Sequence, residues 1–128
     1  MKPDLKGLTK LARVLRGVPK KQFDMGDWYQ ETPCGTKGCI AGWAAMVFPY
    51  RFKKDYPYTH DDGNITSYDV IHRASGEGGE VGFAKAFRIS EEDAEDLTLG
   101  NMSKKRTPKA AAKAVMALVG RLKKSLKK

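Results

Sequence analysis

The sequence feature that most constrains the fold is the stretch at residues 33–47, PCGTKGCIAGWAAMV. It mixes glycines and alanines with bulky apolar side chains, and the next charged residue after Lys37 is Arg51. An apolar run of roughly ten residues is too short to cross a bilayer. Because small residues allow neighbouring elements to approach closely, we expect a tight glycine turn that leads into a helix at the centre of a small core.

The same stretch carries a resemblance to a known family. FDMGDW at residues 23–28 and CGTKGCIAGWAA at residues 34–45 match the pattern F-x-M-x-x-W, a short polar loop, and CGT-x-x-C-I-A-G-W-A. This pattern resembles a family of small uncharacterised proteins carried by bacteriophages and prophages. A looser similarity follows in residues 83–98 and 107–115. The resemblance implies an accessory protein of a phage or mobile element, and it transfers no catalytic residue.

Size and composition indicate one globular domain. The chain has 128 residues, of which 41% are hydrophobic, and this suffices for a single core. No hydrophobic run reaches the length of a membrane span, and the first ten residues lack the apolar segment of a signal peptide. We therefore expect no membrane partner and a cytoplasmic location, in the host cell for a phage protein. In that reducing compartment the two cysteines are expected to be thiols.

The net charge of +9 is concentrated near the C-terminus. After Asp96 the sequence contains ten bases and no acid, whereas the preceding residues contain 14 bases and 15 acids. This asymmetry predicts that the C-terminal segment, residues 104–128, is a basic amphipathic helix that meets an anionic partner.

Helical signals recur along the chain and predict an all-α fold of five or six short helices around the central one. Asp4 and Ser90 are suitable N-caps, and Thr107 followed by Pro108 gives the clearest helix start. Two prolines and several turn residues indicate an irregular surface loop at residues 49–66, or at most a short hairpin. The expected helices lie at 4–16, about 36–48, 67–74 and 81–87, with two more beginning at 90 and 107.

The glycine turn is the first candidate binding site. If Gly35, Thr36 and Gly38 precede a helix, their backbone N–H groups and the helix dipole favour a phosphate or carboxylate, and Lys37 adds a positive charge. A helix cap formed by Thr36 explains the same residues without a ligand. The turn lacks the full G-x-x-x-x-G-K-[ST] pattern, which argues against an ATPase.

Two further segments extend the candidate site. In residues 50–58 tyrosines alternate with basic residues, a combination that stacks bases and holds phosphates but also suits a loop that covers the core. Lysines of the last helix form either a solubilising face or an anion-binding face. The predicted ligand-binding residues are Gly35, Thr36, Lys37, Gly38, Tyr50, Arg51, Lys53, Tyr56, Lys109 and Lys113.

The cysteines allow a different chemistry. Cys39 at a helix start is a candidate nucleophile, with His60 or His72 as the base. The C-x4-C spacing of Cys34 and Cys39 does not match common zinc sites, and buried structural thiols explain the pair more simply. The cluster at residues 60–62, His-Asp-Asp, is more typical of a solvated turn than of a metal site.

The sequence therefore favours a non-enzymatic protein that binds a phosphate-bearing small molecule, with no cofactor and no metal. By analogy with other phage proteins, one form of this function is the sequestration of a nucleotide signal used in host defence. Three alternatives remain open: nucleic-acid binding through the basic C-terminal helix, a cysteine hydrolase built on Cys39, and an inhibitor that binds an acidic host protein.

Overall fold

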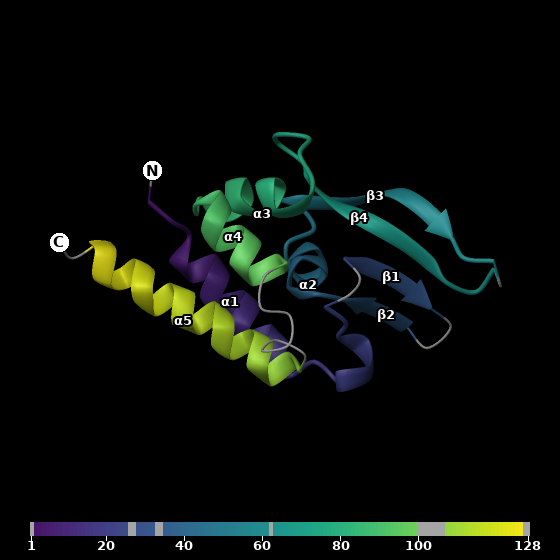
Figure 1. Ribbon diagram of the computed structural model, residues 1–128, viewed down its shortest axis with the longest axis horizontal. Coiled ribbons are helices and arrows are strands. Elements are labelled where there is room, and N and C mark those ends of the chain that lie inside the picture. Colours follow the sequence, from purple (N-terminus) through teal and green to yellow (C-terminus); the bar gives the residue numbers. More distant parts are fainter. Residues whose placement is uncertain (1, 26–27, 33–34, 62, 100–106, 127–128) are drawn as a thin grey trace.

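The protein is a mixed α/β domain in which five α-helices pack beside a four-stranded antiparallel sheet (Figure 1). The computed structural model describes residues 2–25, 28–32, 35–61, 63–99 and 107–126. In chain order the elements are α1 (Leu5–Arg16), a short 3-10 helix η1 (Lys20–Gln22), β1 (Tyr29–Thr32), β2 (Gly35–Gly38), α2 (Ile40–Val47), β3 (Phe52–Thr59), β4 (Thr66–His72), α3 (Gly79–Phe87), α4 (Glu91–Thr98) and α5 (Pro108–Leu126).

Helices α1 and α5 lie side by side although they come from opposite ends of the sequence (Figure 1). Each presents an apolar stripe at helical spacing, and the two stripes are buried against each other and the core. Because α1 enters and α5 leaves at the same end of the molecule, the two helices run antiparallel. The start of α1 therefore lies next to the end of α5.

The sheet has the strand order β2-β1-β4-β3, and each neighbouring pair is antiparallel. Strands β3 and β4 form a long hairpin that projects away from α1 and α5 (Figure 1). Lys54 of β3 reaches across β4: it pairs with Glu31 of β1, and its Nζ lies 4.8 Å from the ring centroid of Tyr68. This contact ties the edge strand to the middle of the sheet.

Helix α2 occupies the centre of the molecule between the other helices and the sheet (Figure 1). Gly42 makes this position possible, because a Cβ there would lie 1.8 Å from the carbonyl oxygen of Trp28. Gly38 is similarly tight, with a Cβ expected 3.1 Å from the same oxygen. The prediction of a closely packed central helix in the core is therefore confirmed, since Ile40 and Ala44 are fully buried.

Aromatic rings fill the space between α2, α3 and the sheet. Phe83 and Phe87 have centroids 4.8 Å apart, and Phe87 lies 5.7 Å from Phe48 and 6.0 Å from Phe52. All four side chains are at most 3% exposed. Such offset and edge-on ring pairs add to the stabilisation from burial alone.

The all-α prediction is wrong. Residues 49–66, predicted as an irregular loop, include the whole of β3, and residues 67–74, predicted as a helix, contain most of β4. Tyr68, Val70 and Ile71 have aromatic and β-branched side chains that suit a strand, and residues 66–72 pair with β1 and β3. Pro57 is tolerated because β3 is an edge strand with an irregularity between Asp55 and Tyr58.

The predicted central helix at 36–48 is also too long, because residues 35–38 form β2 and α2 begins at Ile40. Three helix starts were predicted correctly. The Asp4 side chain accepts from the Gly7 N–H at 3.0 Å, the Ser90 hydroxyl accepts from Asp93 N–H at 3.0 Å, and the Thr107 hydroxyl accepts from Ala110 N–H at 3.1 Å.

Candidate functional site

The glycine turn is not the start of a helix. Gly35, Thr36, Lys37 and Gly38 form β2, in which each residue is paired with one of β1. The Thr32 hydroxyl donates to the Gly35 carbonyl oxygen at 2.8 Å, and Cys39 is the residue before α2. The N–H groups of this stretch are therefore arranged along a strand instead of converging on one point, as a phosphate loop requires.

The predicted ligand-binding residues in 50–58 do not form one site. Arg51 makes a structural ion pair, whereas Lys53 and Tyr56 lie on β3 of the hairpin. Arg51 forms an ion pair with Asp4, and its guanidinium lies 4.6 Å from the centroid of the Phe48 ring. Lys53 pairs with Asp55 at 3.4 Å on β3. Tyr56 lies further along β3 with φ of 53° and an exposure of 69%.

Arg51 and Asp4 form a link between α1 and the chain that follows α2. Burial of the Asp4 carboxyl would raise its pKa, but hydrogen bonds from the Gly7 N–H and the Arg51 guanidinium hold that pKa below its ordinary value. Asp4 is the single acid in residues 1–22, which contain seven bases. Asp4 pairs with Arg51, and α1 itself contains no acid. The bases of α1 therefore have no carboxylate partner on their own helix.

Lys109 and Lys113 lie in the first part of α5 and are exposed. At a rise of about 1.5 Å per residue, Lys113 is about 15 Å along the helix axis from Lys123, and Lys109 is about 21 Å away. The lysines of the last helix therefore do not form one site. The structure thus distributes the ten predicted residues over β2, β3, the turn after α2, and the start of α5.

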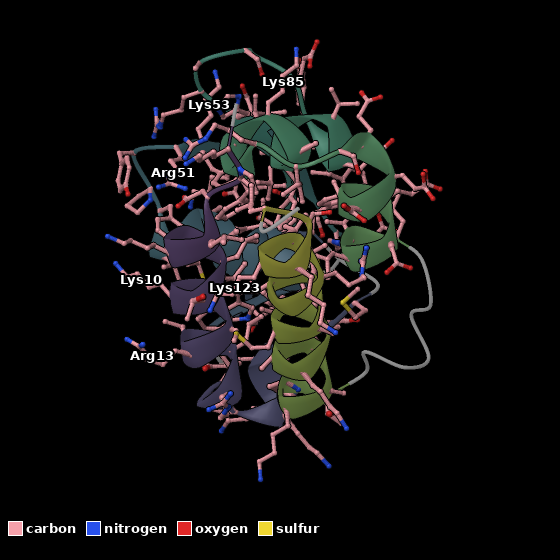
Figure 2. The ribbon with its side chains drawn as sticks, turned by 90° about the vertical axis from the view of Figure 1, so that its left-hand side faces the viewer. Lys10, Arg13, Arg51, Lys53, Lys85 and Lys123 are labelled. Carbon is pink, nitrogen blue, oxygen red and sulfur yellow. The ribbon has the colours of Figure 1, made fainter. Side chains whose placement is uncertain are left out.

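A groove between α1 and the end of α5 gathers basic side chains in a way that none of these segments does alone. Its volume is about 390 Å³. In Figure 2, Lys10 and Arg13 project from α1 away from α5, and Lys123 of α5 lies between the two helices. We call this feature the α1–α5 groove; its lining residues are Leu5, Lys6, Thr9, Lys10, Arg13 and Lys123.

The helical repeat explains why α1 supplies three of the four bases. Lys6, Lys10 and Arg13 are spaced by four and three residues, so that their side chains follow one face of the helix. The opposite face carries Leu8, Leu11 and Leu15, which are fully buried. The amphipathic pattern that attaches α1 to the core therefore directs this row of bases to the surface.

Acidic side chains are segregated from the groove. Five of them lie in α4, three of these in its first turn, where they favour the helix start, and α5 separates this helix from α1 (Figure 2). Arg121 of α5 points to this acidic side and contacts Asp93 at 3.3 Å. Among the residues that the structure describes, none of those lining the α1–α5 groove is acidic, and no ion pair involves Lys6, Lys10, Arg13 or Lys123.

A larger pocket of about 690 Å³ also contains basic residues, but acids accompany them. Arg51 is paired with Asp4, Lys85 Nζ lies 2.8 Å from Glu77, and Glu91 is part of the lining. The remaining lining residues are His72, Ala84, Ala86, Arg88 and Ile89. Because its charges are largely compensated, this pocket is a weaker attractor of anions than the α1–α5 groove.

The residues of the hydrolase hypothesis have other contacts. Cys39 is 2% exposed, and its thiol lies 3.8 Å from the Trp28 carbonyl oxygen. His60 Nε2 and His72 Nδ1 each lie 2.8 Å from a serine hydroxyl, of Ser67 and Ser75 respectively. Burial and the nearby Lys85 lower the pKa of His72, against the smaller opposing effect of Glu77. Cys34 and Asp62 lie outside the described residues.

Sequence reasoning missed the contribution of α1. The charge count divided the chain at Asp96 and described everything before it as neutral, although residues 1–22 hold seven bases and one acid. A count over shorter windows, together with the 6-10-13 spacing, is the signal that identifies the basic face of α1. That Lys123 lines the same groove as this face depends on the tertiary structure.

Within the described part of the chain, there is no group of three or more metal-ligating side chains, and no helix is long and apolar enough to cross a membrane. Comparison of this chain with protein-family models, with curated proteins and with solved structures finds no match.

Proposed function

We propose that this protein is a non-enzymatic nucleic-acid-binding protein that contacts the sugar-phosphate backbone through the α1–α5 groove. The observation that supports this proposal is that four bases from two helices line one groove, and that no described acid lines it. Phosphate groups spaced along a polyanion match such a row of cations, and the release of counterions on binding drives the association.

The character of the groove favours a polymer backbone over a small nucleotide. Small-molecule sites are usually enclosed and mainly apolar, with a few polar groups in defined positions. The surface of the groove is largely the aliphatic carbon of its long side chains, and its four charges are carried at the ends of flexible stems and not at fixed positions. Three of the four bases are lysines, whose compact charge on a flexible stem suits phosphates at variable positions.

The number of bases in the groove sets how strongly the affinity for nucleic acid is expected to depend on salt concentration. Lys6, Lys10 and Arg13 span about 10 Å along α1, and Lys123 adds a charge from the adjacent helix. Four phosphate contacts predict a slope of about −3.6 on a duplex, and about −2.8 on a single strand, for the logarithm of affinity against the logarithm of salt concentration. Between 50 and 200 mM salt, the affinity is then expected to fall by about two orders of magnitude.

Two double variants of equal charge provide the test. Lys10→Gln with Lys123→Gln removes two bases of the groove, whereas Lys109→Gln with Lys113→Gln removes two exposed bases at the other end of α5. Binding to a labelled 20-nucleotide single strand and to its duplex is measured by fluorescence anisotropy at four salt concentrations. We expect the groove variant to weaken binding and to reduce the slope by about 1.8 on the duplex and about 1.4 on the single strand, with a much smaller effect of the control.

Equal effects of the two variants would show that binding follows net charge and not the groove. Absence of binding to either oligonucleotide would refute the proposal. A panel of mono-, di- and cyclic nucleotides, titrated into the same proteins, examines the small-ligand function separately. A nucleotide that binds tightly to both double variants would support that function instead.

A further inference from the structure

Tyr50 is an exposed aromatic residue in the turn that follows α2. Its side chain is 68% exposed, although a ring of this size usually contributes to a core or to an interface. Tyr50 immediately precedes Arg51, whose side chain returns to Asp4 at the start of α1. The turn is therefore attached to the helix that provides most of the groove.

The ring of Tyr50 packs against two side chains, Phe48 and Arg51. The buried ring of Phe48 meets it edge-on, with centroids 6.1 Å apart and an interplanar angle of 84°. The guanidinium of Arg51 lies 5.6 Å from the Tyr50 centroid and is held in place by Asp4. A large ring with such support keeps its orientation at little cost in entropy and presents an apolar surface to solvent.

Phe48 also connects this ring to the α1–α5 groove. The Nζ of Lys10, which lines the groove, lies 5.4 Å from the centroid of the Phe48 ring, and the Tyr50 ring meets this same ring edge-on. Figure 2 shows Lys10 and Arg51 on the same side of the molecule. The groove thus provides cations for phosphates, and next to its edge Tyr50 provides an exposed aromatic surface.

We infer that the nucleic acid bound by the groove is single-stranded and that Tyr50 stacks on one of its bases. This inference rests on the proposed function and specifies its substrate class. Unpaired bases can turn away from their backbone and stack on aromatic side chains, whereas the bases of a duplex already stack on each other. A cationic groove next to an exposed ring is the usual arrangement in proteins that bind single strands without sequence preference.

Tyr58 provides a matched control. It is 61% exposed, similar to Tyr50, but it lies on the β3–β4 hairpin, which projects away from α1 and α5 (Figure 1). Replacement of either tyrosine by alanine removes the same atoms from the surface. Only Tyr50 is close to the groove, so that a stacking role there predicts different outcomes for the two substitutions.

The experiment measures the affinity of the full chain for an oligothymidylate and for a duplex with the same number of phosphates in the bound region. Tyr50→Ala is expected to weaken binding of the single strand by about 5- to 150-fold, the range of one base–aromatic stack. Duplex affinity and the salt slope should not change, because no phosphate contact is lost. Tyr50→Phe should restore the affinity, and Tyr58→Ala should behave like the parent protein.

The possible failures are distinguishable. If both oligonucleotides bind but Tyr50→Ala has no effect on the single strand, or Tyr50→Phe does not restore binding, the stacking inference is refuted and the groove is not. If neither oligonucleotide binds, the proposed function fails as well. The melting temperature of each variant excludes loss of folding as the cause. Photo-crosslinking to an oligonucleotide that contains 5-iodouracil should identify Tyr50, and a crosslink to Tyr58 instead would contradict the inference.

Discussion

Replacement of Gly42 by alanine examines the central feature of this fold most directly. In the folded protein a Cβ at this position would lie 1.8 Å from the carbonyl oxygen of Trp28 and 3.0 Å from its carbonyl carbon. Side-chain Cβ atoms do not approach other heavy atoms closer than 3.0 Å. Helix α2 or the backbone of Trp28 must therefore move by at least about 1.2 Å.

The expected cost follows from the surroundings of the glycine. The obstructing atoms belong to the backbone, so that no side-chain rotation can relieve the contact, and Ala41 and Ala44 pack α2 into the core with no exposed surface. Overpacking of this kind costs about 3 kcal/mol or more, and the better helix propensity of alanine offsets about 1 kcal/mol. We expect a net loss of about 2 kcal/mol or more in the free energy of unfolding.

Thermal and urea unfolding, followed by circular dichroism, measure this loss. For a chain of this size, 2 kcal/mol corresponds to a decrease of about 6–12 °C in melting temperature. Gly120→Ala in α5 is the matched control, since a Cβ there has no neighbour within 4 Å and should stabilise the protein by up to about 1 kcal/mol. A Gly42→Ala protein as stable as the parent would refute the close approach of α2 to Trp28.

Three further predictions concern other parts of the structure. Because the folded-state pKa of Asp4 is lowered, its ionised form contributes stability that is complete above the unfolded-state pKa of about 4 and is lost as the pH falls through the folded value; Asp4→Asn should flatten the urea stability profile in this acidic range. Trp43→Phe should cost about 1 kcal/mol in urea unfolding, because the Nε1 donates to the Gln22 carbonyl oxygen at 3.0 Å. In a Cys34→Ala protein, alkylation of the buried Cys39 thiol at neutral pH should be slow until denaturant is added, and rapid labelling of the native protein would favour the hydrolase hypothesis.

Local signals in the sequence were sufficient for most of the helices. Asp4, Ser90 and Thr107 cap α1, α4 and α5 as predicted, because a cap depends on a side chain and an N–H group a few residues apart. The small-residue stretch at 33–47 also correctly indicated a closely packed central helix. Interactions of this range are encoded within one turn of chain and need no knowledge of the rest of the fold.

The sheet could not be predicted in the same way. Strands β3 and β4 lack a regular alternation of apolar and polar residues, because most of β3 is exposed and its hairpin extends beyond the core. Their stability depends on pairing with each other and with β1, which a single segment does not reveal. The glycines of β2 were predicted to form a turn at the start of a helix. A glycine-rich turn before a helix and a short edge strand have the same composition, and only the pairing with β1 distinguishes them.

The candidate site shows the division most clearly. Helical periodicity is a property of one segment, and it makes α1 and α5 amphipathic with bases on the polar face of each, although the sequence analysis recognised this basic face only for α5. Only the tertiary structure decided that the start of α1 meets the end of α5, which brings Lys6 and Lys10 next to Lys123 and away from Lys109. Burial of the two apolar stripes sets this antiparallel arrangement, and the groove of bases forms as its consequence.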